Sequence, residues 1–390
     1  MRLNYFFLIG IITLGLVACN SSDTVIPENI RTEKNVTIQI SNGNMGTRSL
    51  ESPVTAATVN LVKNALVIFT NGNDNTSTIV FAKPLTGSDL TQLMSSTNGN
   101  KGYTIKVPTA ATHVYVVLNS TTAITNLAVV NKTIAELNAA VLQINDMNTK
   151  AEAADANSTG TITMYGKDIL TADAVTAGFG PNAQAADLYA NVIVSPLVAR
   201  VEVTNVTPKT GSQISSFTID GVIIKKLHQT ITLGSTAESL VDYSNITAGA
   251  GQTLNTAYYT ESDGTYSGTD KNMRNLISPI TFTSSNIAGF QLAAAATPIM
   301  VLKLSNIKLT GNVNYGDDAT KKYYIVIRGF KSNGTSVASL TANNVYKLDL
   351  SGENGIDVNN ITEDVDVIQK SVWVGVSITP WTVVNVTPTF

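Results

Sequence analysis

The chain contains very little cysteine and few charged residues. Cys19 is the only cysteine among its 390 residues, so no disulfide forms within the chain and no thiolate cluster is available to a metal. Charged residues make up 14% of the chain, against about 25% in an average soluble protein. The net charge is -3 and no basic stripe is visible, which argues against nucleic acid as a partner. Abundant threonine, serine and asparagine indicate an exported β protein with uncharged outer faces.

Motifs for catalysis and for binding metals or cofactors are also missing from the sequence. No GxSxG, Walker or dinucleotide-binding glycine motif occurs. His113 and His228 are the only histidines, and they have neither HExxH spacing nor a cysteine partner. Asp317 and Asp318 lack the distal bidentate glutamate of a calcium loop, which favours a solvated turn. The sequence therefore predicts a protein that is not an enzyme and that uses no cofactor or metal.

The amino-terminal residues are typical of an export signal. Arg2 precedes an apolar stretch that is too short to span a bilayer and that ends in LVAC at residues 16–19. A lipoprotein signal peptidase needs a small residue at the cut and a thiol that can carry diacylglycerol. Ala18 and Cys19 supply both. We therefore predict that Cys19 is lipidated; the alternative is an ordinary secretory peptide with an incidental cysteine.

A strand and an exposed loop are predicted after a short polar tether. In the stretch NVTIQI, Val36, Ile38 and Ile40 alternate with polar residues, which is the period-2 pattern of a half-buried strand. The next eight residues carry two glycines and two asparagines and end in Arg48. Such a loop is extended and reachable, so we expect a trypsin-like protease to cut after Arg48. Arg31 precedes the strand, and a cut there would leave the strand in place.

Strand patterns dominate the remainder of the chain and predict an all-β fold. Pro196 cannot donate to a central ladder, and we place a domain boundary between residues 195 and 196. The further strands are predicted at residues 61–70, 113–119, 192–206, 216–226, 299–309, 323–330, 345–350 and 371–378.

One short helix is indicated, near residues 133–143. Thr133 and Glu136 have the spacing of a capping box, and the apolar residues Leu137, Val141 and Ile144 continue one face.

The carboxyl end of the sequence has another strand pattern. Within residues 381–390 (WTVVNVTPTF), apolar residues occupy every second position from Val384 to Phe390. Chains often end in frayed polar residues, so an apolar alternating end is unusual. Such a segment pairs either within its own domain or with another subunit.

These features together resemble the fimbrillins, the major-subunit lipoproteins of type V pili in Gram-negative bacteria. The resemblance covers essentially the whole chain. It rests on residues 16–19, the alternating strand before Arg48, residues 131–137 (NKTIAEL), 197–203 (LVARVEV), 343–350 (NNVYKLDL) and the segment from Trp381.

The resemblance implies two transthyretin-like β-sandwich domains in tandem, with the one short helix in the first domain. It also implies surface export as a lipoprotein and removal of an amino-terminal propeptide. The implied parts are a signal peptide (1–18), a propeptide with the lipidated cysteine (19–48), an N-terminal domain (49–195), a C-terminal domain (196–380) and a donor strand (381–390).

The implied mechanism is activation by proteolysis. An arginine-specific protease would cut between Arg48 and Ser49. On physical grounds, the loss of Val36, Ile38 and Ile40 would leave an unpaired strand edge and an uncovered core, which a strand from another copy can restore. The donor residues implied for that strand are Trp381, Val384, Val386 and Phe390.

The implied partners are other copies of the chain, other fimbrial subunits, the protease, outer-membrane lipid before cleavage, and host or bacterial surface receptors. The implied location is the outer membrane for the precursor and then the cell-surface fimbrium. Two alternatives stay open: a tip or accessory adhesin, and a glycan-binding surface lipoprotein. The latter would favour exposed aromatic platforms, whereas aromatics make up 6% of the chain and its tryptophans are Trp373 and Trp381.

Overall fold

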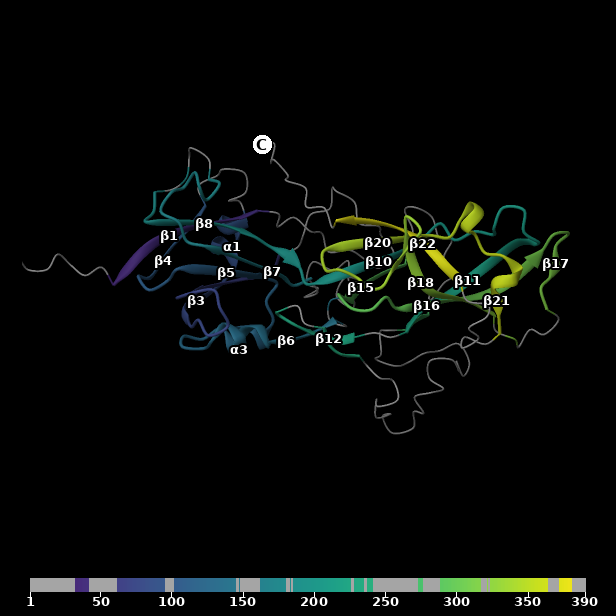
Figure 1. The fold of residues 1–390 in the computed structure, drawn as a ribbon, viewed down its shortest axis with the longest axis horizontal. Coiled ribbons are helices and arrows are strands. Elements are labelled where there is room, and N and C mark those ends of the chain that lie inside the picture. Colours follow the sequence, from purple (N-terminus) through teal and green to yellow (C-terminus); the bar gives the residue numbers. More distant parts are fainter. Residues whose placement is uncertain are drawn as a thin grey trace, which may run out of the picture. The chain divides into compact units, whose positions relative to one another are not determined.

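A computed structural model represents the chain, and most of its described residues are β-strands (Figure 1). The all-β fold predicted from the sequence is therefore confirmed. The structure describes residues 32–41, 62–94, 102–144, 147, 162–179, 183, 185–225, 228–234, 237–240, 273–275, 288–316, 321, 323–363 and 372–380.

Two sheets enclose the first hydrophobic core. One has the strand order β4-β1-β8 and the other the order β3-β2-β5-β7-β9. Val36 of β1 and Val116 of β5 are fully buried in the same core cluster, so the two sheets form a sandwich. The strands are β1 (Glu33–Ser41), β2 (Ala65–Thr70), β3 (Ile79–Leu85), β4 (Tyr103–Pro108), β5 (His113–Leu118), β7 (Met164–Ile169), β8 (Leu188–Ile193) and β9 (Ser195–Pro196).

Pro196 lies at the margin of its sheet, as its missing N–H requires. It belongs to β9, which pairs with β7 and ends the strand order. The predicted strand over 192–206 is thus divided into the end of β8, the short β9 and the long β10 (Val198–Thr204).

The described residues contain three short α-helices where the sequence predicts one. They are α1 (Gly87–Met94), α2 (Thr122–Leu127) and α3 (Ile134–Asn138). The capping box is present at α3: the Glu136 N–H donates to Thr133 Oγ1 at 3.2 Å, and the Thr133 N–H donates to the Glu136 carboxylate at 2.8 Å.

The predicted extent of this helix was wrong. It ends at Asn138, and β6 (Val141–Gln143) follows. Val141 is 42% exposed, so its side chain does not continue the buried face of the helix. The reason is the strand pairing of this segment with β12 (His228–Thr232), a partner far along the chain. The strand β13 (Ala237–Leu240) completes the sheet β13-β12-β6.

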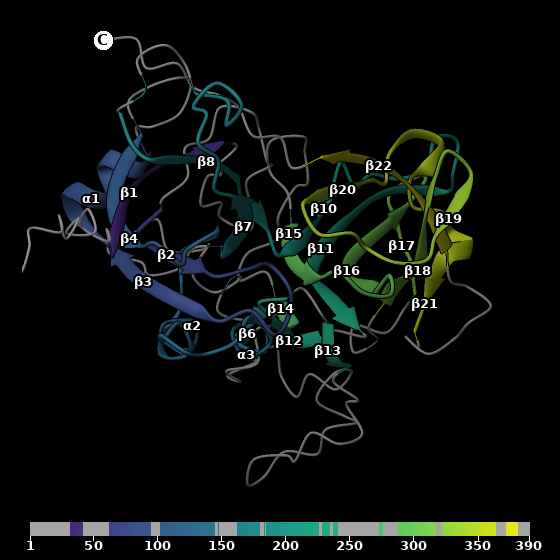
Figure 2. The same ribbon diagram turned by 60° about the vertical axis from the view of Figure 1, so that its left-hand side comes forward.

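The second hydrophobic core is enclosed by an 11-stranded sheet. Several strands of this sheet are labelled in Figure 2. The main path of the sheet is β14-β11-β16-β18-β22-β20-β10-β15, while β17 pairs with β16 and both β19 and β21 pair with β18. Besides β10, the strands are β11 (Ile214–Lys225), β14 (Met273–Asn275), β15 (Ala288–Ala293), β16 (Ile299–Leu309), β17 (Val313–Asn314), β18 (Tyr323–Ser332), β19 (Thr335–Val337), β20 (Asn344–Asp349), β21 (Ile361–Thr362) and β22 (Val372–Pro380).

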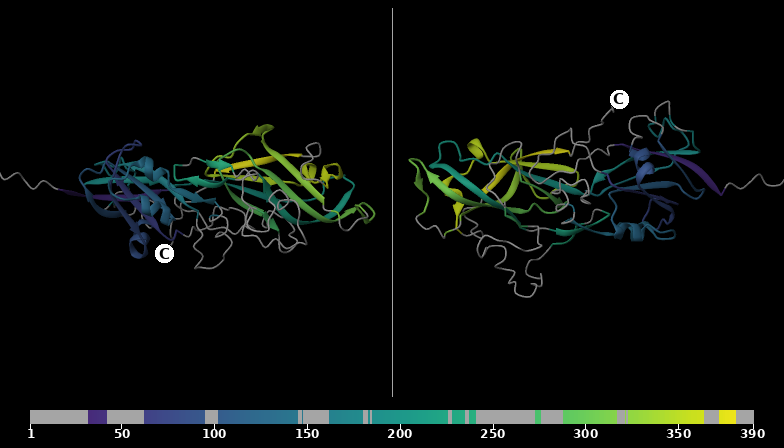
Figure 3. Two further views of the ribbon diagram at one scale, coloured as in Figure 1. Left: turned by 90° about the horizontal axis from the view of Figure 1, so that it is seen from below. Right: turned by 180° about the vertical axis from the view of Figure 1, so that it is seen from behind.

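Strand β22 joins two parts of this sheet. One part has the order β14-β11-β16-β18 and the other the order β20-β10-β15. Strand β22 runs parallel to β18 and antiparallel to β20. Val201 of β10 and Leu302 of β16, one from each part, are fully buried in the same cluster, so the sheet folds over its own core (Figure 3). Two 3-10 helices follow β20, at Gly352–Asn354 (η1) and Val358–Asn360 (η2).

Candidate functional site: the slot around strand β1

Strand β1 lies between two other strands (Figure 1). It pairs antiparallel with β4, where Val36 faces Ile105, and parallel with β8, where Val36 faces Leu188. Loss of β1 would therefore expose two strand edges, one on β4 and one on β8. We call the position between β4 and β8 the β1 slot.

The inward face of β1 carries the residues predicted for the removable strand. Val36, Ile38 and Ile40 are all buried in the first core cluster. Because side chains alternate along a strand, these residues share one face, and the helix α1 packs against the same strand. Burial of each such side chain contributes about 1.5–3 kcal/mol, which makes this face the main apolar attachment of β1.

The other face of β1 is buried as well, which the half-buried pattern did not predict. Thr37 is fully buried and Gln39 is 4% exposed. The hydroxyls of Thr37 and Thr104 lie 2.7 Å apart, within hydrogen-bond distance, and Gln39 Nε2 donates to the Gly178 carbonyl at 3.0 Å. Uncharged polar residues therefore suit this face, because each has a partner within the fold.

A turn over residues 171–179 contributes to that cover. A Cβ added at Gly102 would lie 2.5 Å from the Thr37 methyl and 2.9 Å from the Phe179 ring. Phe179 packs edge-on against Tyr189 of β8, with ring centroids 5.4 Å apart. The polar face of β1 thus lies under aromatic side chains, and an incoming strand would meet the same surroundings.

Polar contacts fix the amino end of β1. Lys34 Nζ donates to the carbonyls of Thr109 and Ala111, at 3.0 and 2.5 Å. Asn35 and Asp187 exchange two hydrogen bonds, one of them from the Asn35 N–H to the Asp187 carboxylate at 2.7 Å. Burial lowers the pKa of Lys34, and the Asp187 charge opposes that shift. These contacts hold the register of β1.

A polar cluster beside the slot was not predicted from the sequence. Lys83 of β3 donates to Asp89 of α1 and contacts the Tyr103 hydroxyl of β4, both at 2.8 Å. Tyr103 is opposite Ile38 in the β1–β4 ladder. Hydrogen bonding to Asp89 raises the pKa of Lys83, and the same contact lowers the pKa of Asp89. Sequence spacing gave no sign of this cluster, because its members come from three separate elements.

The other predicted site residues lie outside the described residues. These are Cys19, Arg48, Ser49, Trp381, Val384, Val386 and Phe390. The described part of the chain holds no cluster of three or more His, Cys, Asp or Glu side chains arranged for a metal. None of the helices in that part is long and apolar enough to cross a membrane.

Comparison with solved structures places this fold beside bacterial fimbrial proteins. A fimbrilin (FimA) from Porphyromonas gingivalis W83 superimposes with a TM-score of 0.50 and 14% identity, over 90% of this chain and 99% of that chain. The tip fimbrial protein Mfa3 from P. gingivalis gives a TM-score of 0.45 and 11% identity, over 90% and 100% of the two chains. A candidate cell adhesion protein from Bacteroides eggerthii DSM 20697 gives 0.48 and 16%, over 90% and 96%.

Sequence comparison adds no relative, since no family model and no curated protein matches the chain. At 14% identity the similarity to the fimbrilin shows the fold alone. The fimbrillin resemblance found in the sequence is confirmed at that level.

Proposed function

We propose that the protein is a structural subunit of a surface fimbrium that polymerises by exchange of a β-strand. The observation that carries this proposal is the position of β1, a strand from the amino-terminal end of the chain that is paired on both sides and buried on both faces. Removal of such a strand would leave a slot with two open strand edges. Another extended segment can fill that slot by strand addition.

The energetics favour a durable joint. A main-chain hydrogen bond adds about 0.5–1.5 kcal/mol net, and β1 pairs through both of its edges. Each buried valine or isoleucine adds about 1.5–3 kcal/mol. Ordering of the incoming strand opposes these terms. Pairing on two sides supplies about twice the main-chain contribution that a single edge would offer.

We propose that residues 381–390 of a neighbouring copy supply the incoming strand. Val384 and Val386 have the same spacing as Val36 and Ile38, and the intervening Asn385 is polar and uncharged, like Thr37. From Val384 onward the segment therefore offers apolar residues to the core and uncharged polar residues to the opposite face. In this proposal Val384, Val386 and Phe390 point into the vacated slot and Trp381 begins the strand.

Processing controls assembly in this proposal. The precursor is anchored to the outer membrane through Cys19, and β1 blocks the slot until an arginine-specific protease cuts between Arg48 and Ser49. We also propose that the N-terminal domain comprises residues 49–195, the C-terminal domain residues 196–380 and the donor strand residues 381–390. Cleavage breaks the covalent link between the subunit and its lipid, and the release of β1 then opens the slot.

Limited proteolysis of the full chain under native conditions tests the proposal. Trypsin-like cleavage should give a product that begins at Ser49 and forms oligomers, detected by amino-terminal sequencing and electron microscopy. Arg48→Ala should leave monomers. Long fibres whose subunits still contain residues 33–48 would contradict the activation step.

The donor strand is tested separately. A chain without residues 381–390 should fold and be cleaved but should not lengthen fibres. Val386→Asp should reduce assembly strongly, because it places a charge in the core. Val313→Asp is the control, because Val313 lies on β17 and is 58% exposed. In the proposed alignment Thr387 takes the position of Gln39, whose side chain is buried. Thr387→Asp is therefore also expected to weaken assembly, unlike a substitution on an exposed face. Normal fibres from the shortened chain would exclude the tail as donor.

A further inference from the structure

An aromatic side chain lies exposed on the outer face of the 11-stranded sheet. Trp373 of β22 is 51% exposed, while its neighbour Val374 is buried in the core. A single exposed apolar side chain is common on protein surfaces, so the groups around this ring decide whether it forms part of a contact site. Tryptophan is also a favourable residue for a contact that is apolar on one side and polar on the other.

Two glycines shape the surface around this ring. A Cβ added at Gly329, the residue paired with Trp373 on β18, would lie 2.6 Å from the indole ring. The ring therefore lies flat on the neighbouring strand because position 329 has no side chain. Gly375 follows on the same face of β22, and a Cβ there would meet nothing within 4 Å. This second glycine leaves a hollow beside the ring.

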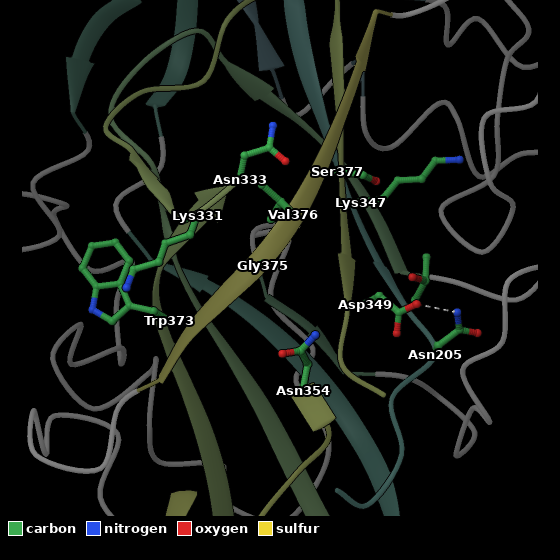
Figure 4. Close-up of a pocket in the computed structure, with 12 residues that line it drawn as sticks. Asn205, Lys331, Asn333, Lys347, Asp349, Asn354, Trp373, Gly375, Val376 and Ser377 are labelled. Carbon is green, nitrogen blue, oxygen red and sulfur yellow. Dashed lines mark hydrogen bonds between the residues drawn. The ribbon is translucent and has the colours of Figure 1, made fainter. Parts of the chain in front are cut away.

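The hollow has a volume of about 690 Å³ and a mainly polar rim (Figure 4). Asn205 Nδ2 donates to the Asp349 carboxylate at 3.0 Å, which orients both side chains. Lys347 and Ser377 come from adjacent strands and lie opposite one another in the ladder. The rim thus offers amide, hydroxyl, carboxylate and ammonium groups around one aromatic platform.

Lys331 is one of two lysines that line the hollow. Its ammonium group lies 5.6 Å from the centroid of the Trp373 ring (Figure 4). A cation–π contact at an exposed site is weak, so a ligand can displace the ammonium from the ring and keep it alongside. Lys347 is the second cation of the hollow, and its Nζ lies 4.0 Å from the buried Glu202 carboxylate.

We propose that this hollow binds a sugar residue that carries an acidic group. The apolar face of a pyranose ring stacks on an indole, its hydroxyls exchange hydrogen bonds with amides and carboxylates, and a carboxylate or sulfate pairs with Lys331. A flat aromatic platform, a hollow kept open by glycine and a polar rim together match that ligand. The site lies on a different sheet from the β1 slot, so binding does not depend on strand exchange.

Two matched pairs of oligosaccharides test the proposal by calorimetry on the uncleaved full chain. The pairs are sialyllactose with lactose, and a hyaluronan tetrasaccharide with chitotetraose. At least one acidic member should bind, its neutral partner should bind more weakly, and the affinity should fall as salt is added. No binding by either acidic sugar, or equal binding of acidic and neutral members, would overturn the proposal.

Four variants locate the binding. Trp373→Ala and Gly375→Val should each weaken binding by about tenfold or more, because one removes the platform and the other fills the hollow. Lys331→Met should weaken the acidic sugar and leave the neutral one unchanged. Val313→Ala, at an exposed position away from the hollow, is the control.

Thermal unfolding of each variant should match the parent protein, since Trp373 and Gly375 lie on the outer face. If Trp373→Ala and Gly375→Val both leave sugar binding intact, the hollow is not the site. If these variants leave sugar binding intact and instead change the bundling of fibres formed by cleaved protein, the hollow is a contact between subunits and the proposal fails. Since uncleaved monomers are used, a failure to polymerise does not affect the result.

Discussion

At the scale of single residues, Glu136 shows how local hydrogen bonds stabilise the charged form of a carboxylate. Its carboxylate accepts from Lys132 Nζ at 2.7 Å and from the Thr133 N–H at 2.8 Å. These bonds, led by the one from Lys132, lower its pKa from 4.5 to about 2. A lowered pKa means that the contribution to stability is fully present above pH 4.5 and is lost as pH falls through about 2.

Glu136→Gln is therefore expected to destabilise the protein at neutral pH and to have a shrinking effect as pH falls from 4.5 towards 2. Thermal unfolding of both proteins across this range measures the difference. Thr133→Ala, which removes the other half of the capping box, should cost about 0.5–2 kcal/mol at pH 7. A Glu136 carboxyl that titrates near 4.5 by NMR would contradict the assignment.

Ile38 is the residue on which the packing of β1 can be tested. It is fully buried in the first core, and Ile38→Ala should destabilise the full chain by about 2–5 kcal/mol. Ile169→Ala is the matched control, because Ile169 is 53% exposed and its loss should change stability by less than about 0.5 kcal/mol. Urea unfolding monitored by circular dichroism measures the change in the free energy of unfolding for each variant. Equal effects would show that β1 is not held by its apolar face.

At the scale of elements, one side of the β1 slot depends on a close backbone approach. A Cβ added at Gly166 of β7 would lie 2.1 Å from the Ile193 carbonyl oxygen at the end of β8. These strands belong to different sheets, so position 166 sets how near the sheets come at that point. A side chain there must displace main-chain atoms, which cannot rotate away.

Gly166→Val should therefore destabilise the protein by about 1–3 kcal/mol, as overpacking does. It should also loosen β8 and speed the hydrogen exchange of its amides. Gly375→Ala is the stability control, since a Cβ at that position meets nothing within 4 Å. Unchanged exchange in β8 would show that the contact between the two sheets does not support the slot.

At the scale of the whole molecule, the strand-exchange proposal predicts a subunit that is incomplete without β1. A chain that begins at Ser49 should unfold at a lower temperature than the full chain, because the first core loses Val36, Ile38 and Ile40. A peptide of residues 33–41 should restore stability, by about 1.4 kcal/mol for each tenfold increase in peptide once it is in excess. The same peptide with Ile38→Asp should have no effect, and equal stability of the two chains would contradict the proposal.

Much of the fold could be predicted from local patterns. The strand predicted at residues 299–309 coincides with β16, and the capping box at Thr133 begins α3. Asn333 and Gly334 form an Asn-Gly pair, which is typical of a two-residue hairpin turn, and both have positive φ, at 49° and 80°, between β18 and β19. Alternation, capping and turn chemistry are encoded within a few residues, so a single sequence is enough to reveal them.

The surroundings of each strand could not be predicted in this way. Alternation identified the inward face of β1, but the cover on its other face comes from Gly178, whose carbonyl is 139 residues from Gln39 along the chain. The same limit applies to Trp373, which lies open on its strand because Gly329 on β18 leaves room for the ring. The sequence by itself determined which residues form strands and which face of each strand is apolar. Only the tertiary structure decided which strands are neighbours, because pairing and cover depend on contacts between segments that are far apart in the chain.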